Sequence, residues 1–105
     1  MDNFKIIYKI LRELEKNMGN ENFSVETISA QKLKISFEKW EQLLILMQDE
    51  GYIKGLVLSK DLESLYRHIT EPIKPQITMR GLEYLANNST LAKAKEVLKM
   101  AGEII

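Results

Sequence analysis

The sequence predicts one mostly helical α+β domain in which helices flank a β-hairpin. In residues 3–17 and 37–50, apolar residues recur at steps of three and four, the period of an amphipathic helix. After Gly51 the period changes, and two β-rich runs separated by a turn indicate a hairpin over residues 52–70. A chain of 105 residues suits a single domain, 1–105, whose core needs no disulfide.

The first helix is expected over residues 3–17 and ends before Gly19. Its core-facing stripe is predicted from the three-and-four spacing of Phe4, Ile7, Tyr8, Leu11 and Leu14. Ile6 and Ile10 lie off that stripe, so we expect a second side of this helix to be covered as well. For residues 20–28 the sequence allows two predictions, a short strand or a single turn before the next helix.

Two helices follow in close succession. Ser29 is placed to cap a short helix over residues 29–34, and Ser36 to cap a longer one over residues 37–50. So few residues between two helices indicate a helix-turn-helix.

The longer of these helices is unusually apolar. Trp40 belongs to its inward stripe and is therefore expected in the core rather than at a binding site. The run from Leu43 to Met47 is apolar on every side of the helix, so it is either buried all round or faces a partner.

The hairpin is expected to pair residues 52–58 with residues 65–69, with a turn that begins at Ser59. Pro72 and Pro75 exclude a central strand, so the segment around them is expected to be an edge or an exit loop.

Two more helices complete the expected fold. Thr78 caps a helix over residues 79–87, Asn87-Asn88-Ser89 breaks it, and a last helix covers residues 90–105. Gly81 falls in a first turn, where glycine disfavours the helix, so we expect it to serve close packing against the hairpin. This order of elements predicts a winged helix-turn-helix domain with a two-stranded wing and an added C-terminal helix.

The chain lacks the constellation of residues that catalysis or metal binding requires. It has no cysteine, and its five glycines are scattered. Its one histidine, His68, stands beside Arg67 without a second ligand at coordinating spacing. We therefore expect no catalytic site, no metal and no cofactor, in a protein that is not an enzyme.

The sequence also favours a cytoplasmic protein without membrane contact. The N-terminus has no basic region followed by an apolar stretch, so no signal peptide is expected. The longest apolar run, Leu43 to Met47, is far too short to cross a bilayer.

Two segments resemble phrases of winged-helix proteins of the PadR and MarR type. Ile77-Thr78-Met79-Arg80-Gly81-Leu82-Glu83-Tyr84-Leu85 is similar to the phrase that follows the wing and opens the next helix. Glu50-Gly51-Tyr52-Ile53 is similar to the phrase that ends the recognition helix. Together with the N-terminal helix and the Asn-Asn-Ser-Thr turn, they make the whole chain resemble the YjcQ-like family, small winged-helix proteins of Gram-positive bacteria and their phages. The resemblance implies DNA binding through the helix over residues 37–50.

The first functional interpretation is therefore a phage-related or bacterial regulator that binds double-stranded DNA weakly. The residues expected to contact DNA are Lys32, Lys34, Lys39, Gln42, Lys54, Lys60, Arg67 and His68. The chain has no net charge, and only residues 54–80 carry a basic excess, five basic against three acidic residues. Because neutralised phosphates supply most of the affinity, so small an excess predicts weak binding.

The alternative is a protein-interaction module without DNA binding. In this interpretation the acidic helix over residues 37–50 meets a basic partner, or its apolar run meets another subunit. A continuous basic stripe from Lys32 through the wing would favour DNA, and a broken stripe would favour a protein partner.

A homodimer is also expected. Apolar residues of the last helix follow the alternating steps of three and four that are typical of a coiled-coil seam. The predicted dimer surface comprises Ile6, Ile10, Leu91, Ala94, Val97, Leu98, Ala101, Ile104 and Ile105. The competing interpretation is that this helix packs on its own domain through the same stripe.

Overall fold

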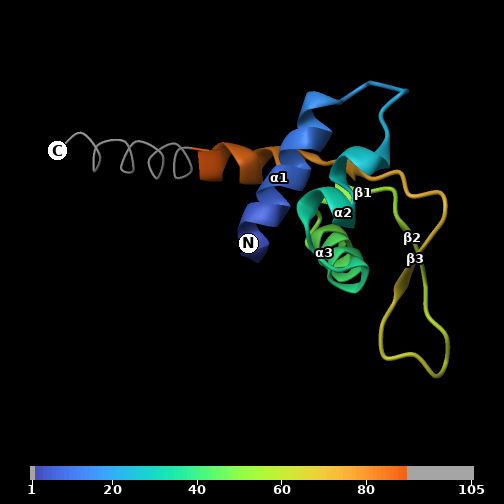
Figure 1. The fold of residues 1–105 in the computed structure, drawn as a ribbon. Coiled ribbons are helices and arrows are strands. Elements are labelled where there is room, and N and C mark those ends of the chain that lie inside the picture. The colour runs from blue at the N-terminus through green and yellow to red at the C-terminus, as the bar shows by residue number, and fades with distance from the viewer. Residues whose placement is uncertain (1, 90–105) are drawn as a thin grey trace.

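The computed structural model describes residues 2–89, which form an α+β fold of helices and small antiparallel sheets (Figure 1). The elements are α1 Asn3–Lys16, the 3-10 turn η1 Val25–Ile28, α2 Ala30–Leu33, α3 Phe37–Asp49, β1 Ile53–Lys54, β2 Val57–Ser59, β3 His68–Thr70 and β4 Gln76–Ile77. A further helix covers residues 79–89. The predicted helix over 90–105 lies outside the described residues, as do Leu91, Ala94, Val97, Leu98, Ala101, Ile104 and Ile105.

Serine caps open α2 and α3, as predicted. Ser29 Oγ accepts the backbone N–H of Lys32 at 3.2 Å, and Ser36 Oγ accepts that of Lys39 at 3.1 Å. Lys34 ends α2 with a left-handed φ of 58°, which turns the chain into α3. The two helices therefore follow each other with a short turn between them.

The core-facing side of α1 differs from the predicted stripe. Leu11 and Leu14 are buried as expected, but Phe4 is 71% exposed, and Ile6 and Ile10 are fully buried in the core. Both faces have helical period, and the packing of α1 on η1, α3 and β4 selects the second one. Because their own domain covers these two isoleucines, the prediction that they join a dimer surface was wrong.

The apolar residues of α3 lie in the interior. Trp40 is buried as predicted, and its Nε1 donates a hydrogen bond of 2.7 Å to the carbonyl of Ile28, the last residue of η1. This turn resolves the open segment 20–28 in favour of a turn rather than a strand. Of the run from Leu43 to Met47, only Leu46 is exposed.

The strands form two ladders rather than one. β2 pairs with β3, and β1 pairs with β4. We call residues 56–70 the hairpin. The predicted second strand at residues 65–69 was misplaced, since β3 begins at His68, and pairing resumes beyond Pro75 in β4. Pro72 and Pro75 lie between β3 and β4 and have no N–H to donate, so the two ladders are separate. The sequence did not predict β4, because a strand of two residues is too short to show an alternating pattern.

The helix that follows β4 does not break where it was predicted to break. Residues 87–89 are still helical, because the polar side chains bond back to carbonyls of their own helix. Asn88 Nδ2 donates to the carbonyl of Tyr84 at 2.8 Å, and Ser89 Oγ donates to that of Ala86 at 3.1 Å.

A tight junction connects the end of α3 to the start of the helix over residues 79–89. Gly51, at a φ of 82°, ends α3 in a Schellman motif in which Tyr52 N–H donates to the carbonyl of Met47 at 2.9 Å. Thr78 caps the later helix by accepting the N–H of Gly81 at 3.1 Å, and its hydroxyl donates to the carbonyl of Gly51. The two segments that resemble winged-helix proteins, residues 50–53 and 77–85, thus contact each other at this junction.

Gly81 lies against Tyr52, the first residue of the segment predicted as the hairpin, which confirms the predicted close packing at that residue. A methyl group at Gly81 would collide with the carbonyl oxygen of Tyr52 and would lie 2.6 Å from Ile77 Cγ1. The rings of Tyr52 and Tyr84 pack against each other with centroids 5.0 Å apart.

Gly81→Ala is expected to lower the free energy of unfolding by about 1–3 kcal/mol, because overpacking outweighs the gain of about 0.5–1 kcal/mol in helix propensity. Urea unfolding measures the change. Glu83→Ala, an exposed position in the same helix, is the control and should change stability by less than about 0.5 kcal/mol. A higher melting temperature for Gly81→Ala would show that the contact is loose.

Candidate functional site

Five of the eight residues predicted to contact DNA are exposed lysines. Lys32, Lys34 and Lys39 surround the turn between α2 and α3, while Lys54 lies in β1 and Lys60 follows β2. No ion pair to any of the five is found among residues 2–89. These lysines are therefore free to meet an anionic partner.

The other three predicted residues, Gln42, Arg67 and His68, are engaged within the protein. Gln42 Nε2 donates to the carbonyl of Arg67 at 2.9 Å. The guanidinium of Arg67 forms two hydrogen bonds with the carboxylate of Asp49. His68 Nδ1 lies 2.8 Å from Glu41 Oε1. The structure thus brings these three residues together as contacts between α3 and the hairpin.

Glu41 and Gln42 take the place of a neighbouring strand along the outer edge of β3. Glu41 Oε2 accepts the N–H of Ile69 at 3.0 Å, and Gln42 donates to the carbonyl of Arg67. A paired strand would satisfy the same two backbone groups, which an edge strand otherwise leaves open. The Glu41 side chain is 6% exposed, and both of its oxygens have partners.

Gln48 completes the backbone of the hairpin's other arm. Its amide oxygen accepts the N–H of Leu56 at 2.9 Å, and its amide nitrogen donates to the carbonyl of the same residue at 3.0 Å. Ile45 lies between Glu41 and Gln48 on this side of α3 and is buried. The polar side of α3 is thus the support on which the hairpin rests.

The ion pair between Asp49 and Arg67 fixes the end of this contact. The Arg67 guanidinium, hydrogen-bonded to Asp49, holds the pKa of that carboxyl below its ordinary value of 3.8. The same contact raises the pKa of Arg67. Both groups are therefore charged at neutral pH, and two hydrogen bonds hold the guanidinium of Arg67 against α3.

The sequence alone does not reveal the supporting roles of Glu41, Gln48 and Asp49, and it assigns the acidic residues of this helix to contact with a basic partner. Their spacing carries a signal, because positions 41, 48 and 49 lie on one helix face around Ile45. Only the position of the hairpin turns that face into a set of hydrogen bonds.

Glu41, His68 and Ser64 are aligned in the order of an acid–His–Ser catalytic set. Ser64 Oγ lies 3.5 Å from His68 Nε2, but it donates to the carbonyl of Tyr66 at 2.8 Å and accepts that residue's N–H at 3.2 Å. A serine held in its own turn is poorly placed as a nucleophile. In the described part of the chain, no group of acidic or histidine side chains forms a metal site.

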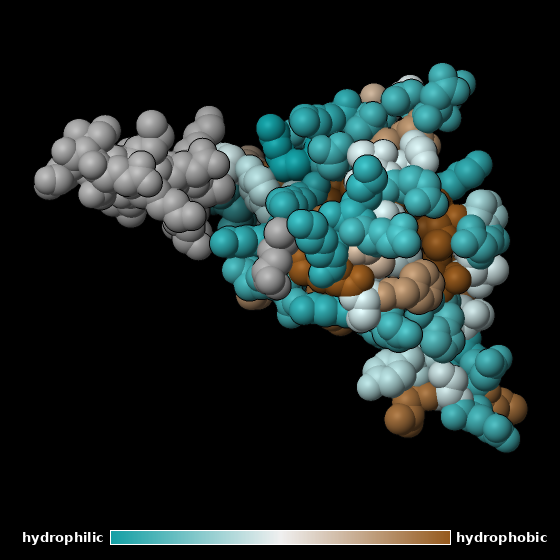
Figure 2. Space-filling model, viewed as in Figure 1, coloured by the Kyte–Doolittle hydropathy of each residue, from teal (hydrophilic) through white to brown (hydrophobic). Residues whose placement is uncertain are grey.

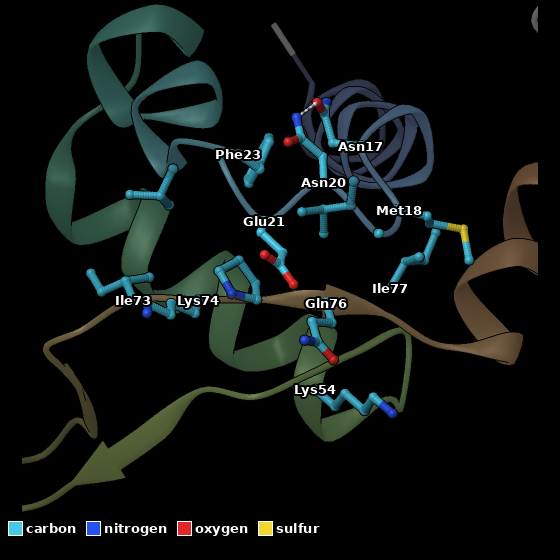
Figure 3. Close-up of a pocket in the computed structure, with 14 residues that line it drawn as sticks. Asn17, Met18, Asn20, Glu21, Phe23, Lys54, Ile73, Lys74, Gln76 and Ile77 are labelled. Atoms are coloured by element: carbon cyan, nitrogen blue, oxygen red, sulfur yellow. Dashed lines mark hydrogen bonds between the residues drawn. The ribbon is translucent and has the colours of Figure 1, made fainter.

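A hollow with a volume of about 640 Å³ lies between the α1–η1 connection and the segment before β4 (Figure 3). On one wall Asn20 Nδ2 donates to Asn17 Oδ1 at 3.2 Å, and Gln76 and Lys54 lie on the other. Its polar side chains mix one carboxylate, from Glu21, with amides and ammonium groups. This mixture provides no convergent catalytic or metal-binding set.

The tip of the hairpin is apolar and exposed. Leu62 is fully exposed, Leu65 is 87% exposed and Tyr66 is 59% exposed. Figure 2 shows hydrophobic atoms at this far end of the hairpin. Asp61 and Glu63 flank Leu62, so no basic stripe continues from the α2–α3 turn through the tip.

Glu41→Leu is expected to lower the free energy of unfolding by about 1–3 kcal/mol, because the Ile69 N–H loses its buried acceptor. Urea unfolding measures the loss, and amide hydrogen exchange at Ile69 should accelerate. Glu38→Leu changes an exposed glutamate of the same helix and should leave that exchange rate unchanged. Equal protection of Ile69 in both variants would contradict the role assigned to Glu41.

Comparison with known proteins places the chain in a family. The family model described as "YjcQ protein" matches residues 8–104. The "Uncharacterized protein YjcQ" of Bacillus subtilis (strain 168) is 29% identical over 99 residues, which cover 94% of this chain and 93% of the relative. No solved structure matches the chain. Among the described residues, no helix is long and apolar enough to cross a membrane. A match over nearly the whole length confirms the resemblance seen in the sequence, and the chain belongs to the YjcQ family.

Proposed function

We propose that the chain has a winged helix-turn-helix fold and acts as a non-enzymatic module that binds another protein. The order of elements supports the fold, because α2 and α3 are joined by the three residues 34–36 and are followed by the hairpin, which corresponds to the wing. The engaged hydroxyl of Ser64 and the mixed lining of the hollow support a role without catalysis.

The observation that carries the proposal is that the hairpin occupies the polar side of α3. A recognition helix reads bases with free donors and acceptors, whereas Glu41, Gln42 and Gln48 are bonded to the hairpin backbone. The charged residues that α3 still exposes include Glu38 and Lys39, so the remaining surface offers phosphates little attraction.

The contact surface in this proposal is the hairpin tip, which we define as Leu62, Leu65 and Tyr66. Exposed apolar side chains gathered on one projection are typical of protein-binding sites, and tyrosine is enriched among the residues that dominate binding energy. Asp61 and Glu63 at the same tip favour a partner with basic groups around an apolar depression.

The double variant Leu62→Asp, Leu65→Asp is expected to keep the stability of the wild type within about 0.5 kcal/mol, because both side chains are exposed. It should lose the proteins that the tagged wild-type chain captures from its native cells. Leu46→Asp changes an exposed leucine on α3 instead and serves as the control. Recovery of the same proteins with the tip variant would place docking elsewhere.

A second candidate function, weak DNA binding, is favoured by one observation. Lys32, Lys34 and Lys39 are exposed together around the N-terminal end of α3, the end that enters the major groove in helix-turn-helix proteins. Few phosphate contacts, and amide side chains of α3 that are already bonded to the hairpin, would make such binding depend little on DNA sequence.

Duplexes of random sequence and of the native promoter region are expected to bind with equal affinity, no tighter than roughly 10⁻⁴–10⁻⁶ M at physiological salt. Fluorescence anisotropy measures both affinities. The variant Lys60→Gln, which removes one positive charge from the hairpin, is measured in parallel to show whether the wing contributes to binding. Nanomolar binding to the promoter duplex alone would identify a sequence-reading regulator and would contradict the protein-binding proposal.

A further inference from the structure

The solvent-facing side of α1 carries a straight row of cations. Lys5, Lys9, Arg12 and Lys16 are all exposed and follow one another at steps of four, three and four residues. At 3.6 residues per turn they fall within an arc of about 60° on the helix and extend over about 16 Å. The buried residues of α1, such as Ile10, lie on the opposite side.

No acidic or apolar residue shares this row, which we call the α1 crest. The glutamates of α1 lie beside it, where Glu15 contacts Arg12 at 2.9 Å and Glu13 contacts Lys16 at 3.7 Å. Such exposed pairs between neighbouring turns contribute little free energy, so both cations are available to another anion. Figure 2 shows mostly hydrophilic side chains over α1. The chain thus concentrates positive charge on one ridge although its net charge is zero.

We propose that the α1 crest binds the phosphate backbone of duplex DNA without reading its sequence. Each DNA strand carries one charge per 3.4 Å of helix axis, so the crest spans roughly five phosphates of one strand. A linear row of cations with no apolar member matches a linear row of anions. A protein partner would require an apolar or aromatic centre, and a bilayer would require apolar side chains that penetrate it.

The α1 crest is separate from the hairpin tip. It is an alternative to the lysines of the α2–α3 turn as the surface that gives the chain its affinity for DNA. Lys5 and Lys9 form no ion pair among the described residues, so changing them leaves the pairs of Arg12 and Lys16 intact. Glutamine has nearly the helix propensity of lysine, so the helix should be preserved.

The test is titration of a short random duplex, followed by fluorescence anisotropy from low to physiological salt. Four contacts predict a slope of log K against log salt of about −3 to −4. The double variant Lys5→Gln, Lys9→Gln should reduce that slope by about 2. The double variant Lys32→Gln, Lys39→Gln removes the same charge from the α2–α3 turn and should leave the slope unchanged. Circular dichroism checks that both variants remain folded.

Three results would overturn the proposal. These are no binding at low salt, an equal or larger loss in the α2–α3 variant, and tighter binding to phosphatidylserine vesicles than to DNA with the same dependence on Lys5 and Lys9. None of them affects capture of a protein by the hairpin tip, so failure here is distinguishable from failure of the proposed function.

Discussion

A hairpin of two short strands cannot satisfy its own backbone, and this constraint organises the molecule. Each arm leaves polar groups that in a larger sheet would pair with another strand. Here the side chains of α3 replace that strand, with Glu41 and Gln42 along β3 and Gln48 at Leu56. The acidic and amide character of α3, which suits DNA poorly, follows from this requirement. The same hydrogen bonds place the hairpin along the polar side of α3.

A second constraint acts at the base of the hairpin, where backbone rather than side chains makes the contact. Gly51 reverses the chain after α3, and Thr78 bonds to it from the start of the next helix. Gly81 lets that helix approach the carbonyl of Tyr52. The strands β1 and β4 continue the same junction as a short ladder. The hairpin is therefore held at its base by close packing and along its length by polar bonds.

Locally encoded features could be predicted from the sequence, and features decided by tertiary packing could not. The caps at Ser29 and Ser36 depend on a few neighbouring residues. Trp40 belongs to the apolar stripe of α3, which indicates a single core-facing side for this residue. The first helix offers two apolar faces of equal period, so only its packing decides that Ile10 is buried. The role of Glu41 requires the hairpin, whose contact lies 27 or more residues away in the sequence.

The loop over residues 60–67 contributes little to the hydrogen bonds between α3 and the hairpin and nothing to the junction at the base of the hairpin. Its contacts with α3 come from Arg67, at its last position, so the preceding residues contribute neither to the core nor to the support of the hairpin. Loop entropy changes slowly with length, and a loop of this kind tolerates insertion and exchange. Natural divergence can therefore change the residues of the tip while the scaffold remains the same. For the same reason the chain would make a small carrier for grafted peptide loops.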